Sequence, residues 1–525
     1  MGIYLNQDNL SFRQSLNSEI YVDKSGIISL TNSCINTRDK YVCISRPRRF
    51  GKSMTAEMLC AYYSRGSESG ELFAGLKIAS DGSFAEHLNR YNVVHLNMAD
   101  FSSKGKNIEE KIDYISKCIL RDLKKEFPGS GCSDWSDLND VLKVVFDETR
   151  IPFVFIIDEW DSIFREHEND TAAQKYYLDF LRALLKDQAY VGLAYMTGIL
   201  PIKKYGVHSA LNMFTEISMI DTERYAEFTG FTGSEVEELC SKYSMPIEEI
   251  RKWYDGYEVN GIKVFNPRSV VRSMMSHKLG SYWTSTETYD ALKKYIEMNM
   301  DGLRDKVIAM ISGDRVRVNT RKFQNDMSTF NSSDDVLTLL IHLGYLTYDA
   351  AREECYIPNK EVMDEFMNCI EDRGWEPVMA AINASESLLG YTLSKDTSKV
   401  AEEIDRVHEE STSLINYNDE NSLAMVISLA YYTARNSYFM LREQPAGKGF
   451  ADIIFLPRHD NPNPPIVVEL KFDKSAEGAI EQIKERNYKN AVSNLSEYRG
   501  EIICVGINYD KSTKQHTCAI ETVVQ

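Results

Sequence analysis

The stretch Arg46-Pro47-Arg48-Arg49-Phe50-Gly51-Lys52-Ser53 decides how the first part of this chain folds. It follows the apolar, β-branched run Tyr41-Val42-Cys43-Ile44 and precedes a helical pattern that begins at Met54. A strand, a tight loop ending in Gly-Lys-Ser and a helix together form the context of a phosphate-binding loop. In such a loop, backbone N–H groups and the positive helix end bind phosphates, the lysine reaches the β- and γ-phosphate oxygens, and the serine ligates Mg²⁺.

This loop predicts ATP and Mg²⁺ as ligands. The residues expected to bind the nucleotide are Arg48, Arg49, Phe50, Gly51, Lys52 and Ser53, and Ser53 is also a predicted metal ligand. Arg46 stands where the pattern G-x-x-x-x-G-K-[ST] has its first glycine. Arg48 and Arg49 can contact phosphates or pin the loop to acids such as Asp158 or Asp161, and the five donors of each guanidinium favour the pinning role.

A second apolar run, Phe153-Val154-Phe155-Ile156-Ile157, is typical of a parallel strand buried on both faces. It ends in Asp158-Glu159. A carboxylate at the tip of such a strand, beside a phosphate-binding loop, holds the Mg²⁺ of a bound nucleotide. We therefore predict that Asp158 ligates the metal and that Glu159 orients or deprotonates the attacking water. The alternative is a solvated turn at the strand end.

The first ~230 residues alternate between strand and helix patterns, which predicts a mainly parallel sheet with helices on both faces. Two more strand candidates are Val93–Met98 and Val191–Met196. The latter ends in Thr197, whose hydroxyl is a candidate sensor of the γ-phosphate. Thr197 is equally well explained as the first residue of a turn.

Composition narrows the class of protein. At 525 residues the chain can hold about three domains. A net charge of −18 argues against a protein that coats nucleic acid non-specifically, although a local basic groove is compatible with it. The ten cysteines contain no C-x-x-C pair, which favours reduced, buried thiols over a zinc site. Without a signal peptide or an apolar run near the ~18 residues of a membrane span, we expect a cytoplasmic protein with no membrane contact.

From ~235 to ~400 the pattern becomes helical and polar. Helices are expected around Glu235–Leu239 and Pro246–Ile250, because acidic residues favour helix starts. The segment Val336–Leu346 predicts a helix that leads through Gly344 into a strand, and Tyr356–Asn359 predicts the returning strand of a hairpin. Helices followed by a small hairpin suit a winged-helix lid.

The last ~125 residues contain a second group of candidate catalytic residues. Two strand-like runs, Phe450–Leu456 and Ile466–Phe472, are separated by a loop rich in Asn, Asp and Pro. Side chains alternate across a strand, so Glu469 and Lys471 share one face, and a paired hairpin brings Asp452 to that face. Two carboxylates and a lysine there predict a hard-cation site, with Asp452 and Glu469 as metal ligands and Lys471 acting on a hydrolytic water. The alternative is a surface hairpin with an exposed salt bridge, which contributes about 0–1 kcal/mol.

Both groups of motifs together resemble the family of predicted AAA-ATPase-like proteins with a C-terminal PD-(D/E)XK nuclease-superfamily domain. The resemblance covers nearly the whole chain. It rests on Tyr21-Val22-Asp23-Lys24, the loop at 46–53, Ile157-Asp158-Glu159-Trp160-Asp161, Thr197-Gly198-Ile199, Trp253-Tyr254-Asp255-Gly256-Tyr257, Phe265-Asn266-Pro267, Gly344-Tyr345-Leu346-Thr347, Gly449-Phe450-Ala451-Asp452, Glu469-Leu470-Lys471 and Gln482. It implies a catalytic role for Gln482, on the helix after the second strand. The family usually has Arg where Phe450 stands, and its members are mostly bacterial.

The resemblance implies three parts: an AAA-ATPase-like P-loop domain (1–234), a helical or winged-helix-like lid (235–400) and an α/β restriction-endonuclease-like domain (401–525). The leading hypothesis is an ATPase whose nucleotide state controls a metal-dependent nuclease acting on DNA or RNA. One alternative is an ATP-dependent switch or interaction protein whose nuclease-like fold does not cut. A small-molecule kinase would use the same loop but leaves the Glu-x-Lys hairpin unexplained. The sequence specifies no oligomeric state, although a homo-oligomer is compatible with it.

Overall fold

The structure is a computed structural model of the chain. It describes residues 2–202, 211–221, 223–259, 261–283, 289–298, 300–323, 330–371, 375–411, 420–446, 449–458, 461–485, 492, 498 and 500–524. The chain forms two compact units. Unit 1 contains residues 1–295 and 317–363, and unit 2 contains residues 296–316 and 364–525.

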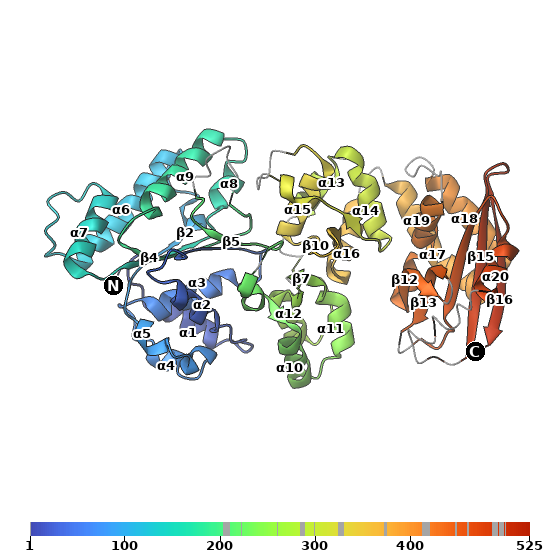
Figure 1. The fold of residues 1–525 in the computed structure, drawn as a ribbon, viewed down its shortest axis with the longest axis horizontal. Helices are drawn as coiled ribbons and strands as arrows, with labels where there is room; N and C mark the ends of the chain where they lie inside the picture. The colour runs from blue at the N-terminus through green and yellow to red at the C-terminus, as the bar shows by residue number, and fades with distance from the viewer. Residues whose placement is uncertain are drawn as a thin grey trace. The chain divides into compact units, whose positions relative to one another are not determined.

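Unit 1 is built around a parallel five-stranded sheet in the order β2-β3-β4-β1-β5. Its strands are β1 Tyr41–Ser45, β2 Asn92–Asn97, β3 Phe153–Asp158, β4 Val191–Gly198 and β5 Thr215–Ile217. The helices on one face are α1 Leu10–Leu16, α2 Ile27–Cys34, α3 Lys52–Tyr63, α4 Gly70–Phe73 and α5 Phe84–His87; those on the other are α6 Ile108–Glu126, α7 Leu138–Thr149, α8 Ser162–Glu166 and α9 Thr171–Leu185. Figure 1 shows this three-layer arrangement.

Both faces of this sheet are buried, which explains the uninterrupted apolar strands. In β3, Phe153, Phe155 and Ile157 pack in the core with α6, α7 and α9. Val154 and Ile156 pack in the opposite core with α2 and α3. Because side chains alternate along a strand, Asp158 follows the second set toward the α3 face. Strand order and alternation therefore place a carboxylate on the same side of the sheet as the phosphate-binding loop.

The rest of unit 1 includes three helices packed on a small antiparallel sheet, with strand order β6-β8-β7. This part comprises β6 Phe231–Thr232, α10 Gly233–Tyr243, α11 Ile247–Tyr254, β7 Tyr257–Val259, β8 Ile262–Phe265 and α12 Pro267–Ser276. Further along the chain, unit 1 contains α15 Ser333–Leu343 and the hairpin of β10 Thr347–Asp349 and β11 Glu354–Tyr356. The helix α14 Leu303–Ile311 belongs to unit 2, and α13 Tyr289–Ile296, β9 Val316–Arg317 and α16 Lys360–Glu371 cross from one unit to the other. Gly344 ends α15 with φ +90°, as the predicted helix-to-strand turn requires.

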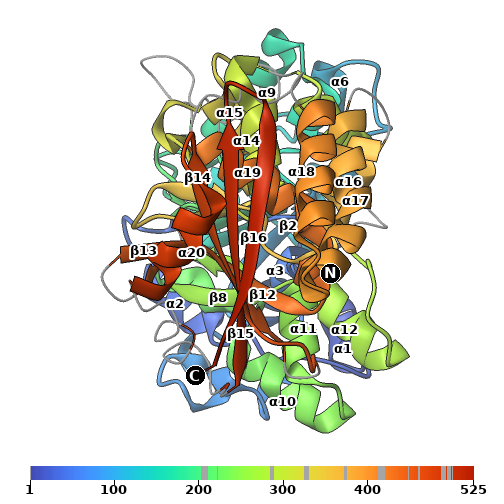
Figure 2. The same cartoon turned by 90° about the vertical axis from the view of Figure 1, so that its right-hand side faces the viewer.

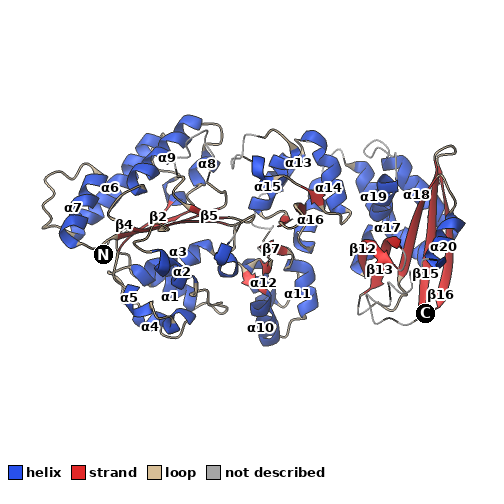
Figure 3. Cartoon of the chain, viewed as in Figure 1, coloured by secondary structure: helices blue, strands red, loops and turns tan. Residues whose placement is uncertain are grey.

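Unit 2 contains a mixed five-stranded sheet in the order β12-β13-β14-β15-β16. Only the β14–β15 pair is parallel. Its elements are α17 Glu376–Leu393, α18 Thr397–Ser411, α19 Glu420–Ala430, β12 Tyr438–Ala446, β13 Gly449–Pro457, β14 Ile466–Phe472, α20 Ala476–Glu485, β15 Glu501–Asp510 and β16 Gln515–Val524. Figure 2 shows the long strands β15 and β16 side by side, and Figure 3 distinguishes the strands of this sheet from its helices.

The predicted fold class is confirmed: a parallel sheet with helices on both faces, a helical region with a small hairpin, and a C-terminal α/β domain with a mixed sheet. The two strand candidates at 93–98 and 191–196 correspond to β2 and β4. All ten cysteines lie in the described residues, and none forms a disulfide.

Candidate functional site

The phosphate-binding loop joins β1 to α3, as the sequence predicts. Gly51 is the N-cap of α3 and has φ +87°, a conformation that glycine adopts without strain. Lys52 is the first residue of the helix, and its ammonium donates hydrogen bonds to the carbonyl oxygens of Arg46 at 2.9 Å and Pro47 at 2.8 Å. The lysine thus lies across the loop, where it can reach a phosphate group held by the loop.

A cavity of about 900 Å³ opens in front of this loop. The loop contributes Arg48, Arg49, Phe50, Gly51, Lys52 and Ser53, which are the predicted nucleotide-binding residues of this segment. Other lining residues come from the N-terminal segment (Phe12, Ile20, Tyr21, Val22, Lys24), from α12 (Pro267, Arg268, Val271, Arg272, Met275) and from the tip of β3 (Glu159). A cavity lined by both apolar and cationic side chains suits a nucleotide, whose base is apolar and whose phosphates are anionic.

Burial lowers the pKa of Lys52 to about 8, and the nearby carboxylates of Asp161, Asp158 and Glu159 oppose this shift. Among the residues that the structure describes, Lys52 forms no ion pair, and three carboxylates lie in its field, so it is poised to pair with an incoming phosphate. Phosphate oxygens bring negative charge close to the ammonium and favour its protonated form.

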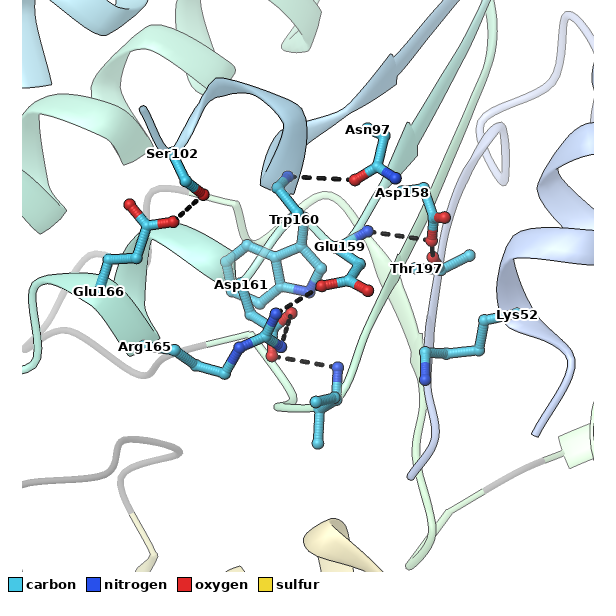
Figure 4. Close-up of polar contacts among 12 residues, drawn as sticks. Lys52, Asn97, Ser102, Asp158, Glu159, Trp160, Asp161, Arg165, Glu166 and Thr197 are labelled. Atoms are coloured by element: carbon cyan, nitrogen blue, oxygen red, sulfur yellow. Dashed lines mark hydrogen bonds and ion pairs between the residues drawn. The ribbon is translucent and has the colours of Figure 1, made fainter. Parts of the chain in front are cut away.

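Asp158 and Thr197 lie together at the ends of β3 and β4. The Thr197 hydroxyl donates a hydrogen bond to Asp158 Oδ1, which also accepts the backbone N–H of Glu159 at 3.0 Å (Figure 4). Asp158 is 2% exposed and Thr197 is fully buried. The two predicted residues are therefore brought together, and Thr197 fixes the orientation of the carboxylate.

Glu159 and Asp161 are joined by Arg165, a residue that the sequence analysis missed. Arg165 is 2.6 Å from Glu159 Oε2 and 3.1 Å from Asp161 Oδ1 (Figure 4). Asp161 is fully buried and accepts the backbone N–H groups of Ile199 and Leu200 at 3.1 and 2.9 Å. Arg165 therefore pins Asp161, and Arg48 and Arg49 line the cavity. The physical reason is that Arg165 lies one helical turn after Asp161.

Two arginines of α12 are further cavity residues that the sequence analysis did not single out. Arg268 and Arg272 line the cavity with Arg49 of the loop. Burial lowers the pKa of Arg268, and the neighbouring charges of Arg49 and Arg272 lower it further. Mutual repulsion among three cations favours an anionic ligand between them. The sequence does predict the start of α12, because Asn266 caps the helix and Pro267 is its first residue. It does not indicate that this helix, and not another, packs beside the loop.

In unit 2, Asp452, Glu469, Lys471 and Gln482 are brought together on one face of the sheet. Ile453 pairs with Val468, so Asp452 occupies the position alongside Glu469. Lys471 donates to Glu469 Oε1 at 2.9 Å, and the Gln482 amide donates to the same oxygen. Asp452 Oδ2 accepts the backbone N–H of Leu470 at 2.7 Å. Glu469 is 2% exposed and Lys471 is 9% exposed, so this cluster is not the exposed surface salt bridge considered above.

Gly506 of β15 allows α20 to carry Gln482 to this cluster. A Cβ atom at this position would lie 2.2 Å from the carbonyl oxygen of Ala476, the first residue of α20. Gly506 is the register partner of Glu469 on the neighbouring strand. The absence of a side chain therefore lets the helix approach the sheet next to the carboxylate.

The donor set in unit 2 suits a divalent hard cation, since two carboxylates project from adjacent strands beside a lysine. Within the described ranges, no group of three or more His, Cys, Asp or Glu side chains is arranged to hold a metal ion. A bound Mg²⁺ would therefore take its other ligands from water, the backbone or substrate, as Mg²⁺ commonly does.

Comparison with protein families gives two matches. Residues 11–208 match the model described as "Predicted AAA-ATPase", and residues 418–518 match the PD-(D/E)XK nuclease superfamily. The chain carries an AAA-ATPase-like domain and a PD-(D/E)XK nuclease-superfamily domain. The resemblance stated from the sequence is thereby confirmed. Lys52, Asp158 and Glu159 lie within the first match, whereas Arg268 and Arg272 lie beyond it. The second match contains all four residues of the cluster in unit 2: Asp452, Glu469, Lys471 and Gln482.

A curated relative, described as "Uncharacterized protein in vnfD 5'region" of Azotobacter chroococcum mcd 1, is 25% identical over 278 residues. The match covers 51% of this chain and 51% of the relative, so the chain spans about half the length of the curated relative it matches. Among solved structures, the ORC2 protein of Aeropyrum pernix matches with a TM-score of 0.29 and 12% identity, covering 70% of this chain and 98% of that one. The Aeropyrum pernix ORC1 protein in complex with DNA matches with a TM-score of 0.24 and 10% identity, covering 87% and 94%.

None of the helices that the structure describes combines the length and apolar character needed to span a membrane.

Proposed function

We propose that the AAA-ATPase-like domain binds ATP with Mg²⁺ in the 900 Å³ cavity and hydrolyses it. The observation that carries this proposal is the convergence of Lys52, Ser53 and Glu159 on that single cavity. Loop N–H groups and Lys52 bind the phosphates, and the apolar side chains of the N-terminal segment accommodate the base. Ser53 and Asp158 are the residues that would hold Mg²⁺, which would supply charge neutralisation at the phosphates.

The residues around the phosphates have separate tasks in this proposal. Glu159 orients and deprotonates the attacking water. Thr197 holds Asp158 in place through its hydrogen bond to the carboxylate. Arg48 and Arg49, with Arg268 and Arg272, provide positive charge toward the phosphate oxygens.

For the nuclease-superfamily domain we propose metal-dependent cleavage of a phosphodiester in DNA or RNA. Asp452 and Glu469 would hold Mg²⁺, which would supply an activated water. Lys471 orients that water, and Gln482 holds Glu469 in position. The nucleotide state of the first domain controls this cleavage in our proposal. The three-part division at 1–234, 235–400 and 401–525 and a cytoplasmic location belong to the same proposal.

The second candidate is an ATP-dependent switch whose nuclease-like fold binds a partner without cutting. A specific observation favours it: Glu469 Oε1 is engaged by both Lys471 and Gln482, which reduces its capacity for a metal ion. The presence of Phe450 where the family usually has Arg points the same way.

One assay on the full chain separates these proposals. ATP hydrolysis is followed by phosphate release while cleavage of labelled DNA and RNA is followed on gels, with Mg²⁺ or Mn²⁺. The leading proposal requires both activities, and nucleic-acid cleavage that differs between ATP, ADP and no nucleotide. Hydrolysis without cleavage under every metal supports the switch, and the absence of both nucleotide binding and hydrolysis contradicts both.

A further inference from the structure

We infer that Glu361 is a positioning residue of the nucleotide site, which it serves by joining the phosphate-binding loop to helix α12. It is the second residue of α16, far along the chain from the loop, and is only 2% exposed. This inference rests on the proposed ATP binding. It adds that the separation between the two cationic walls of the cavity is set by one buried carboxylate.

The first connection runs from Glu361 to the loop through Trp283. Glu361 Oε1 accepts the backbone N–H groups of Tyr282 at 2.5 Å and Trp283 at 2.6 Å. The indole N–H of Trp283 then donates to the carbonyl oxygen of Arg48 at 3.1 Å. Since Trp283 is 1% exposed, its indole is fixed by packing and transmits the position of its backbone to the loop.

The second connection runs from Glu361 to α12 through Ser269. The Ser269 hydroxyl, which is fully buried, donates to Glu361 Oε2 at 2.7 Å. Ser269 follows Arg268 in the first turn of α12, so this hydrogen bond fixes the helix end that presents Arg268 and Arg272 to the cavity. Each carboxylate oxygen of Glu361 therefore holds a different wall of the cavity.

Neighbouring contacts support the loop independently of Glu361. The rings of Phe50 and Tyr257 meet edge to face with centroids 5.3 Å apart, and the Tyr257 hydroxyl donates to the carbonyl oxygen of Gly344 at 2.8 Å. A Cβ at Gly344 would lie 2.8 Å from the Pro47 side chain. These contacts keep the loop folded when the Trp283 hydrogen bond is removed, which makes the inference testable by mild substitutions.

The consequence concerns how the site distinguishes ATP from ADP. Arg49 belongs to the loop wall and Arg268 and Arg272 belong to the α12 wall, and their charges act on one another. A ligand that contacts both walls binds well only if the distance between the walls matches its length. A triphosphate contacts both walls through its additional phosphate, so its affinity depends on that distance. A diphosphate bound to the loop alone does not contact the α12 wall, so its affinity depends on the distance much less.

The test uses the full-length chain with Trp283→Phe, Ser269→Ala and the double variant. Each single substitution removes one connection and should weaken the binding of a non-hydrolysable ATP analogue by roughly tenfold, as expected for the loss of a buried hydrogen bond. ADP affinity should change by less than about threefold. Both connections pass through Glu361. The double variant should therefore lose less affinity for the ATP analogue than the product of the two single losses.

Trp135→Phe and Ser273→Ala are matched controls. Trp135 packs on the distant core formed with α6 and α7, and Ser273 is buried in α12 one turn after Ser269, where its hydroxyl donates within the helix to Val270. Thermal melting establishes that all variants remain folded. A wild-type chain that binds no nucleotide overturns the proposed function itself. If the wild type binds, then unchanged affinities, equal losses for ATP analogue and ADP, or fully multiplicative effects overturn the role of Glu361 alone.

Discussion

Arg165 Nη2 lies 2.6 Å from Glu159 Oε2, and the same guanidinium contacts the fully buried Asp161. Glu159 has φ +49°, so the backbone itself turns this carboxylate away from the strand direction. Burial lowers the pKa of Arg165, whereas the carboxylates of Asp161 and Glu159 raise it. The effect of the carboxylates is the larger, so the pKa lies above its usual value. The guanidinium is therefore charged at every physiological pH and holds Glu159 at the edge of the cavity in front of the loop.

Replacing Glu159 with Gln should preserve nucleotide binding and remove turnover. The amide keeps the shape of the side chain but cannot accept a proton from water, so kcat should fall by roughly 10²–10⁴-fold. Affinity for ADP, measured by calorimetry, should stay within about threefold. Glu166→Gln is the matched control, because Glu166 pairs with Lys111 at 2.7 Å and does not line the cavity. Equal loss of kcat in both variants would refute the assignment of Glu159.

Replacing Lys52 with Ala should abolish nucleotide binding. The loop retains its backbone N–H groups, but no other residue type delivers a point charge to the β- and γ-phosphate oxygens from this position. A fluorescent ATP analogue titrated to millimolar concentrations measures the loss. Lys143→Ala removes a half-exposed lysine of α7 that bonds only to Asp140 among the contacts described, and it should bind like the wild type. Wild-type affinity in Lys52→Ala contradicts the phosphate-binding role of the loop.

The depressed pKa of Lys52 predicts a pH dependence. In the folded protein the ammonium titrates near pH 8, whereas in the unfolded chain it titrates near 10.5. Between these values the unfolded chain binds more protons, so this lysine makes the free energy of unfolding rise with pH. Phosphate binding needs the cation, so nucleotide affinity should fall as pH rises above about 8.

Calorimetry in buffers with different ionisation enthalpies measures this proton linkage. Near pH 7 nucleotide binding should involve no proton uptake by Lys52, and near pH 9 it should take up a proton. Lys52→Arg keeps its charge over this range, so any binding that it retains should show less uptake. Identical uptake in the wild type and Lys52→Arg would mean that another group titrates.

The sequence predicted those site residues whose position is set by the strand or loop that contains them. Lys52, Asp158 and Thr197 follow directly from a loop and two strand ends, because parallel strands direct their carboxyl ends to one edge. Arg268 and Glu361 were not predicted, because their roles depend on which helices pack beside the loop. Contacts between segments far apart in the chain leave no pattern in the neighbouring sequence. The pairing of Asp452 with Glu469 could be predicted, because antiparallel register follows from the short connection between two apolar runs.

Replacing Gly506 with Ala should destabilise the nuclease-superfamily domain. The added methyl would lie 2.2 Å from the Ala476 carbonyl oxygen, so α20 must move and the Gln482–Glu469 hydrogen bond must lengthen. Overpacking of this kind costs about 1–3 kcal/mol. Thermal melting of the full chain should show a lower midpoint for one transition.

The matched control for this substitution is Gly478→Ala, in the first turn of the same helix. There the added Cβ meets only the hydroxyl oxygen of Ser475 at 2.9 Å, and alanine favours the helix. Its midpoint should stay within a degree or two of the wild type or rise. A Gly506→Ala variant with an unchanged midpoint would show that α20 is not held against β15 at this distance.

Substitutions at Asp452, Glu469 and Lys471 decide whether the second cluster performs metal-dependent chemistry. If the two carboxylates hold Mg²⁺, then Asp452→Ala and Glu469→Ala should each remove cleavage and metal affinity together. Lys471→Ala should remove cleavage and spare much of the metal affinity, because the ammonium acts on the water and not on the ion. Metal affinity is measured by calorimetric titration of Mg²⁺ and Mn²⁺, and cleavage is measured on labelled DNA and RNA.

The stability of each variant, measured by thermal melting, can also be predicted. Asp452→Ala relieves repulsion between two carboxylates but also removes the acceptor of the Leu470 N–H, so the two effects offset each other and the stability of the metal-free protein should change by about 1 kcal/mol or less. Glu469→Ala leaves the buried Lys471 without the partner that lies 2.9 Å away, so this variant should lose stability, by roughly 3 kcal/mol for a broken buried pair. Lys484 lies on the same helix as Gln482 and forms an exposed ion pair with Glu521. Lys484→Ala should leave metal affinity, cleavage and the melting temperature unchanged. If the wild type and Asp452→Ala show the same absence of metal binding, the domain is a nuclease fold without nuclease chemistry, and the ATP-dependent switch becomes the better account of this chain.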